Sequence, residues 1–195
     1  AEAPISGLSR ADIARRIAYV PQTQGVAFPY AALDVVLMGR VAHRGVFAGP
    51  TVEDREAALA ALDKLGIGHL AMRDVTRLSG GQRQLVLIAR SLAQAAPLIV
   101  MDEPTASLDF GNQLIVLREI ERLAEAGVGI ILSTHEPSHA LSAASRVALM
   151  REGGILALGP SREVVTSANL SVVYGVDIAI ETTASGRAIA VPANS

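Results

Sequence analysis

The chain has 195 residues and no cysteine, with 50% hydrophobic residues, 18% charged residues and a net charge of −2. This composition indicates a globular protein and excludes a disordered chain, a disulfide framework, a thiolate metal site and a general nucleic-acid binder. No apolar run approaches the ~18 residues of a membrane span, and residues 1–10 lack the pattern of a signal peptide, so we expect a soluble protein of the cytosol.

The first predicted element is a short strand. Residues 17–20 are apolar and β-prone, and Pro21 ends the run, which indicates a buried strand. No sustained period follows over 23–33, where we expect a loop. An apolar pattern returns at 33–38 and predicts a helix.

Two stronger helices follow. Thr51 and Asp54 have the spacing of a capping box, so we expect a helix over 51–65. Ser79 is a favourable N-cap for a second helix, which carries a buried apolar stripe as far as Leu92.

The next stretch alternates strands and helices. Residues 98–101 and 128–132 are apolar runs typical of parallel strands covered on both faces, and a helix is expected between them over 111–126. This order predicts an α/β fold with a parallel sheet.

The C-terminal part changes in character. Its apolar runs are short and flank turns, which predicts β-hairpins. We expect a hairpin over 147–158, a helix over 161–174 and a second hairpin over 176–191.

Asp102 and Glu103 come directly after the strand at 98–101. The carboxyl ends of parallel strands are where α/β folds bind ligands. One carboxylate with phosphate oxygens and waters is a common Mg²⁺ arrangement, and a second carboxylate can align or deprotonate a water. The pair predicts a metal-assisted site, and a plain acidic turn is the alternative.

A second candidate site lies at the start of the helix that Ser79 caps. Ser79, Gly80, Gly81 and Gln82 offer free N–H groups at the positive end of a helix dipole, which suits a phosphate. The glycines leave room for an oxygen close to the backbone. The alternative is an ordinary N-cap followed by flexible glycines.

Two further polar residues follow predicted strands. His135 comes after the strand at 128–132, where a neutral imidazole can hydrogen-bond a terminal phosphate or a water, and a structural histidine is the alternative. Gln22 follows the strand at 17–20 and on its own predicts nothing.

Taken in order, these groups resemble the ATP-binding cassette (ABC) ATPases. The sequence reads Leu-Ser-Gly-Gly-Gln at 78–82, Asp-Glu-Pro-Thr-Ala-Ser-Leu-Asp at 102–109 and Ser-Thr-His at 133–135, and the likeness runs from about Ile13 to Val176. The resemblance implies an α/β, P-loop NTPase-like parallel sheet with an inserted helical subdomain and a small C-terminal hairpin and helix extension. It also implies that ATP and Mg²⁺ are the cofactors.

The resemblance divides the chain into parts of one partial ABC ATPase domain, residues 1–195. A helical subdomain with the signature motif would occupy about 25–95. The core from the acidic strand to the switch histidine would occupy about 96–160, and the C-terminal extension about 161–195.

The resemblance implies a role for each group near the reacting phosphate. Gln22 is similar to the Q-loop glutamine, which contacts Mg²⁺ and the attacking water. Asp102 is similar to the residue that holds Mg²⁺ through water, and Glu103 is similar to the catalytic glutamate. His135 resembles the switch histidine.

Other matched positions imply contacts between two cassettes. Residues 78–82 resemble the signature motif, in which Ser79 and Gly81 meet the γ-phosphate bound to the opposite subunit. Ser107 and Asp109 resemble the D-loop, which communicates across the dimer.

One family motif is missing from the sequence. There is no Gly-Lys-Ser or Gly-Lys-Thr of a phosphate-binding P-loop, and Lys64 is the only lysine. The chain is therefore expected to be an N-terminal truncation of a cassette or a natural variant without an ATP cradle. In either case we expect it to hydrolyse ATP poorly or not at all by itself.

The resemblance also implies partners and a location. The stretch between Gln22 and Leu78 has no heptads, unlike the coiled-coil cassettes of DNA repair, so a transporter is implied. The expected arrangement is a homodimer of cassettes on the cytoplasmic face of the inner or plasma membrane, docked on transmembrane permease subunits through residues 22–49. A periplasmic or surface substrate-binding protein would act indirectly, and no nucleic acid is expected.

Two stretches, residues 13–22 and 159–176, resemble importers of iron–siderophore, haem and cobalamin. The implied function is coupling of ATP hydrolysis to uptake of such a metal chelate. Two alternatives stay open: an ABC ATPase that does not serve transport, and a non-catalytic or truncated cassette that lends its signature motif to a partner.

Overall fold

The computed structural model describes residues 4–22, 28–44 and 49–193. The chain forms two compact units, Ala1–Ser133 and Thr134–Ser195. No helix of the described segments is long and apolar enough to cross a bilayer. The helices of the first unit are η1 (Ile5–Gly7), α1 (Arg10–Arg16), α2 (Ala32–Leu37), η2 (Met38–Arg40), α3 (Val41–Arg44), α4 (Val52–Lys64), η3 (Gly68–Leu70), η4 (Val75–Arg77), α5 (Gly80–Ala93) and α6 (Phe110–Glu125).

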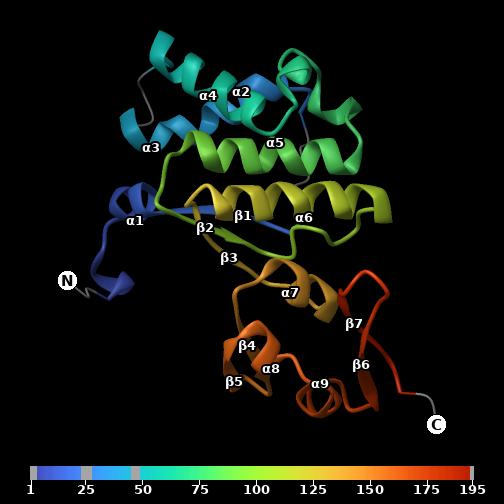
Figure 1. The fold of residues 1–195 in the computed structure, drawn as a ribbon. Coiled ribbons are helices and arrows are strands. Elements are labelled where there is room, and N and C mark those ends of the chain that lie inside the picture. Colours follow the sequence, from blue (N-terminus) through green and yellow to red (C-terminus); the bar gives the residue numbers. More distant parts are fainter. Residues whose placement is uncertain (1–3, 23–27, 45–48, 194–195) are drawn as a thin grey trace. The chain divides into compact units, whose positions relative to one another are not determined.

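The first unit contains a parallel sheet, as predicted. Strands β1 (Ile17–Val20), β2 (Leu98–Met101) and β3 (Gly129–Leu132) pair in the order β1-β2-β3 (Figure 1). The register aligns Val20 with Met101 and Met101 with Leu132. All three carboxyl ends therefore lie at one edge, and the residues that follow each strand meet there.

One face of this sheet is buried. Ala18, Val20, Ile99 and Met101 are at most 1% exposed, and α5 and α6 lie over this side of the sheet (Figure 1). The alternate positions point to the other face, where Tyr19 is 52% and Ile131 57% exposed. The expectation that the strands are covered on both faces is therefore wrong for this second face.

Helices α2, α4 and α5 pack against one another and supply much of the core of the first unit. Leu33, Leu62 and Ile88 are at most 2% exposed, and each such burial contributes about 1.5–3 kcal/mol. An ion pair lies within this packing, because Arg40 Nε is 3.0 Å from Oδ1 of Asp54, which is 1% exposed. The ion pair links η2 to the start of α4.

The structure confirms the predicted helix caps. Thr51 and Asp54 form the predicted capping box of α4, and Ser79 caps α5 together with Gln82. Helices α1 and α3 were not predicted. The part of the expected permease-docking segment at 23–27 and 45–48 lies outside the described residues.

The second unit is built from hairpins and short helices. Strands β4 (Arg146–Arg151) and β5 (Gly154–Pro160) form the predicted first hairpin, and β6 (Ile178–Thr182) and β7 (Ala188–Pro192) form the second. The helix expected over 161–174 is two helices, because Thr166 caps a new one with its side chain. The helices are α7 (Pro137–Ala143), which was not predicted, α8 (Ser161–Val164) and α9 (Ser167–Tyr174).

Candidate active site

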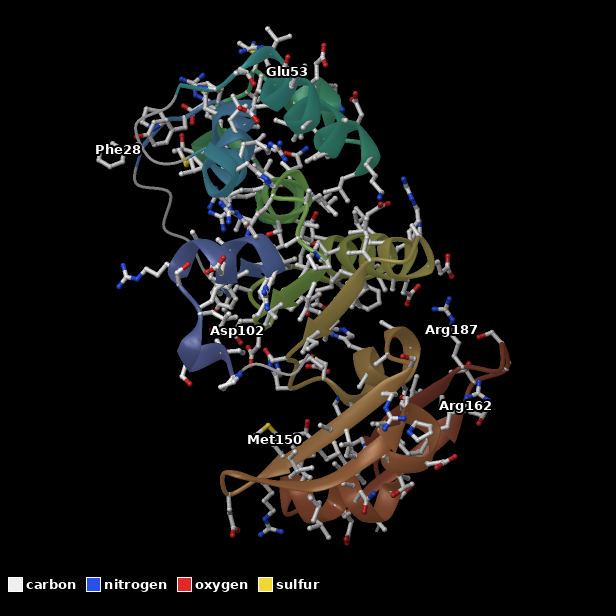
Figure 2. The ribbon with its side chains drawn as sticks, turned by 90° about the vertical axis from the view of Figure 1, so that its left-hand side faces the viewer. Phe28, Glu53, Asp102, Met150, Arg162 and Arg187 are labelled. Carbon is white, nitrogen blue, oxygen red and sulfur yellow. The ribbon has the colours of Figure 1, made fainter. Side chains whose placement is uncertain are left out.

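Asp102 is held at the carboxyl edge of the sheet, directly after β2 (Figure 2). Its N–H donates to the Val20 carbonyl at 2.9 Å and so continues the β1–β2 pairing. Its Oδ1 accepts a hydrogen bond from Ser133 Oγ at 2.7 Å, and its Oδ2 accepts one from the Tyr19 hydroxyl at 3.3 Å. Both carboxylate oxygens are therefore oriented by hydroxyl groups.

Ser133 connects the two acids. Its N–H donates to the Met101 carbonyl at 2.9 Å, which places it beside the end of β2. Its hydroxyl accepts from the Glu103 N–H at 2.9 Å while it donates to Asp102, and a hydroxyl can do both. One side chain thus fixes the Asp102 carboxylate and the Glu103 backbone.

Glu103 has a strained backbone and a polar partner. Its φ of 41° lies in the left-handed region, which costs a non-glycine residue about 1–2 kcal/mol. Its Oε2 accepts a hydrogen bond from Gln22 Nε2 at 2.7 Å. The fold therefore brings together three of the predicted site residues, Gln22, Asp102 and Glu103. Backbone strain of this kind is often found at functional sites.

The Tyr19 hydroxyl remains a proton donor over a wide pH range. Partial loss of hydration at its hydroxyl, and then the negative charge of Asp102, raise the pKa of Tyr19 above its usual value. A neutral phenol can donate to a carboxylate, whereas a phenolate would repel it. Tyr19 is therefore suited to orienting Asp102 at neutral pH.

The acidic edge fits Mg²⁺ that arrives with a phosphate. Among the residues described, no three His, Asp or Glu side chains are grouped to hold a metal by themselves. Mg²⁺ does not require such a cage, since it is usually bound by one or two carboxylates, phosphate oxygens and waters. Asp102 can supply that carboxylate and Gln22 an amide oxygen, so the residues present fit a nucleotide-bound ion.

The start of α5 is a rigid helix tip. Ser79 Oγ accepts from Gln82 N–H at 3.2 Å, and Gln82 Oε1 accepts from Ser79 N–H at 3.1 Å. Ser79 and Gly80 are exposed, whereas Gly81 is buried. A side chain at Gly81 would collide with Asn112 of α6, so the space that this glycine leaves is filled by Asn112. The role of residues 79–82 in ATP binding stays a prediction.

The predicted D-loop lies next to this tip. Asp109 caps α6 through two hydrogen bonds from Asn112, from its N–H at 2.9 Å and from Nδ2 at 2.7 Å. These bonds, the backbone one first, lower the pKa of Asp109. Ser107 is exposed and has a φ of 62°. Gly81, Asn112 and Asp109 therefore form one line of contacts from the helix tip to the D-loop segment.

His135 belongs to the second unit. Its side chain is 60% exposed, and its Nε2 lies 3.8 Å from Glu136 Oε1. Its main-chain carbonyl accepts a hydrogen bond from the Tyr174 hydroxyl at 2.6 Å. A contact of His135 with a phosphate stays a prediction.

Sequence reasoning missed three residues of the site: Tyr19, Ser133 and Asn112. The signal for Ser133 was available, because it follows β3 directly and parallel register places it beside Asp102. The contact of Tyr19 with Asp102 depends on the length of the Tyr19 side chain, and the contact of Asn112 with Gly81 depends on the packing of α5 on α6. Neither of these follows from a one-dimensional pattern.

The fold and the site define a nucleotide-binding domain of the ABC type, and comparison with known proteins supports this. The family model described as "ABC transporter" matches residues 2–106, and the chain belongs to this family. It is 42% identical to the hemin import ATP-binding protein HmuV of Streptomyces coelicolor, over 88% of this chain and 60% of that protein. It is 41% identical to the molybdate import ATP-binding protein MolC of Haemophilus influenzae, over 88% of this chain and 67% of that protein.

A solved structure agrees with these relatives. A chain of a transporter described as of the metal-chelate ABC type, in an inward-facing conformation, matches with a TM-score of 0.86 and 38% identity. The match covers 92% of this chain and 73% of that one. The present chain thus spans 60% of the length of the first of these curated relatives and 67% of the second.

Proposed function

We propose that this chain is part of the ATP-hydrolysing subunit of an ABC importer. The observation that carries the proposal is the hydrogen-bonded set of Gln22, Asp102, Glu103 and Ser133 at the carboxyl edge of the parallel sheet. Such a set supplies a metal-binding carboxylate, a second carboxylate for a water and an amide that orients it.

Each residue has a distinct task in the proposed reaction. Mg²⁺, when bound with ATP, would neutralise charge on the phosphates, and Asp102 would hold it. Glu103 accepts a proton from the water that attacks the γ-phosphorus, the bond from that phosphorus to the bridging oxygen breaks, and ADP leaves with that oxygen. Gln22 holds the attacking water in line. His135 donates a hydrogen bond to a γ-phosphate oxygen. Catalysis of this kind depends mainly on positioning and on stabilisation of charge.

The helix tip at residues 79–82 would act on the ATP of a second copy. Ser79 and Gly80 are exposed, so a γ-phosphate bound to the other cassette can approach the free N–H groups at the start of α5. Two copies would then enclose two ATP molecules. Ser107 and Asp109 would lie at the same dimer contact.

The proposed subunit needs a phosphate cradle that this chain does not carry. Its only lysine, Lys64, is the last residue of α4. We therefore expect negligible ATP hydrolysis from the chain alone. The test uses a completed cassette, in which a P-loop segment of the family precedes residue 1. Phosphate release should appear in that protein and fall by at least about 100-fold in Glu103→Gln, which removes the base. Equal turnover in the two proteins would refute the assignment.

The proposed cargo is a metal chelate such as iron–siderophore, haem or cobalamin. The hemin import relative and the metal-chelate type structure support this cargo, whereas the molybdate import relative has a similar identity. The subunit would sit on the cytoplasmic face of the membrane as a dimer, against permease subunits, with a substrate-binding protein outside. Uptake of labelled hemin, with molybdate as competitor, separates the two cargoes. Hemin uptake that molybdate does not inhibit is the expected result.

A second candidate function is favoured by the combination of an intact helix tip with no Gly-Lys-Ser or Gly-Lys-Thr in the sequence. In that case the chain lends residues 79–82 to ATP held by a different subunit. A partner with an intact P-loop and a defective signature would become active when this chain is added. The Ser79→Arg variant of this chain should not activate such a partner.

A further inference from the structure

The C-terminal motif Val-Tyr-Gly-Val at 173–176 holds the main chain of His135 through one side chain. Tyr174 is the last residue of α9, and its hydroxyl donates to the His135 carbonyl at 2.6 Å, across 39 positions of sequence. Burial, and then the charge of Glu136, raise the pKa of Tyr174, so its phenol stays protonated and able to donate.

The helix that carries Tyr174 is fixed by its neighbours in the second unit. Thr166 caps its start, and Arg151 of β4 donates to the Val172 carbonyl at 2.6 Å. Ser171 Oγ accepts from the Ile178 N–H at 3.0 Å, which ties α9 to β6. Gly175 ends the helix with a φ of 71°, a conformation that suits glycine. The Tyr174 hydroxyl is therefore presented from a rigid support.

We propose that Tyr174 is a positioning residue for His135. By holding the His135 carbonyl, it fixes the backbone from which the imidazole projects, while the imidazole itself remains 60% exposed and able to meet a ligand. This rests on the proposed function, which places His135 at the γ-phosphate. The motif at 173–176 would then tune hydrolysis from the C-terminal extension.

The first test is spectroscopic and uses the full 195-residue chain without nucleotide. The ¹³C shift of the His135 carbonyl reports a hydrogen bond to that atom. Tyr174→Phe keeps the ring and should change this shift. Ser171→Ala, the matched control, removes another hydroxyl bond of α9 and should leave it in place. An unchanged His135 carbonyl in Tyr174→Phe would overturn the proposal.

The second test measures ATP turnover in the completed cassette. Tyr174→Phe should lower kcat about 3- to 10-fold, which is the effect expected from the loss of one hydrogen bond. The KM for ATP should not change. In a His135→Ala background the same change should have no further effect, because Tyr174 acts through His135. Ser171→Ala should lower the melting temperature without lowering kcat.

The outcomes separate this inference from the proposed function. Full kcat in Tyr174→Phe, or an equal loss in the His135→Ala background, would refute a positioning role. Full kcat in His135→Ala would instead refute the proposed role of His135 in hydrolysis, and with it the functional part of the inference. The carbonyl shift would still report whether Tyr174 holds His135.

Discussion

Gly81→Ala should destabilise the protein because the added methyl has no space. The built Cβ would lie 2.7 Å from Cβ of Asn112 and closer still to its amide group. Overpacking of this kind costs about 1–3 kcal/mol, and the better helix propensity of alanine returns up to about 1 kcal/mol. We therefore expect the free energy of unfolding, measured by urea denaturation, to fall by about 1–2 kcal/mol.

The adjacent glycine gives a matched control. A Cβ at Gly80 would meet only the end of the Leu108 side chain, at 3.2 Å, and that side chain can move. Gly80→Ala should therefore change stability by less than about 0.5 kcal/mol. Asn112→Ala should rescue Gly81→Ala only in part, because the Asn112 Cβ remains. Equal effects of the two glycine substitutions would refute the packing of the helix tip on α6.

Three other predictions concern separate parts of the first unit. Arg40→Met removes the cation that pairs with the buried Asp54 carboxylate, and urea denaturation should show a loss of about 3–5 kcal/mol in the free energy of unfolding. A smaller loss would contradict this prediction. The pKa of Asp109 is lower in the folded protein than in the unfolded chain, so the ionised side chain stabilises the fold. This stabilisation is fully present above the unfolded pKa of about 4, and it is lost as the pH falls through the lower folded pKa. The difference in urea midpoint between wild type and Asp109→Ala should therefore be constant above the unfolded pKa and should shrink below it. A difference that grows in acid would contradict this prediction. Ser133→Ala should lower kcat of the completed cassette about 10-fold and raise its Mg²⁺ requirement, with recovery in Ser133→Thr; wild-type turnover in Ser133→Ala would refute the bridging role.

Much of the fold could be predicted because its signals are local. The capping box at Thr51, the N-cap at Ser79 and the strand at 98–101 were predicted to within about one residue. The helix α1 was missed because the seven residues of Arg10–Arg16 bury no side chain and so show no apolar period. The break between α8 and α9 was missed because Thr166 competes with an apolar pattern that would otherwise continue.

In the candidate site, the position of the two acids could be predicted from the sequence, whereas the residues that hold them could not. Asp102 and Glu103 stand at the end of a strand that the apolar run at 98–101 predicts. The hydroxyl contacts of Tyr19 and Ser133, and the placement of Asn112 behind Gly81, depend on distances between elements far apart in the chain. Gly81 was predicted to leave room for a ligand oxygen. The structure shows that Asn112 of α6 occupies the space that a side chain at this position would need.

In the proposed dimer, each reacting site combines the helix tip of one copy with the acids of the other. Mixed dimers of completed cassettes test it directly, using Ser79→Arg for the tip and Glu103→Gln for the acids. A dimer with one substitution on each copy keeps one intact shared site, so we predict about half of wild-type hydrolysis. A dimer with both substitutions on one copy and none on the other should be inactive. The reverse pattern, with activity only when both substitutions are on the same copy, would place each site within a single chain and contradict the shared arrangement.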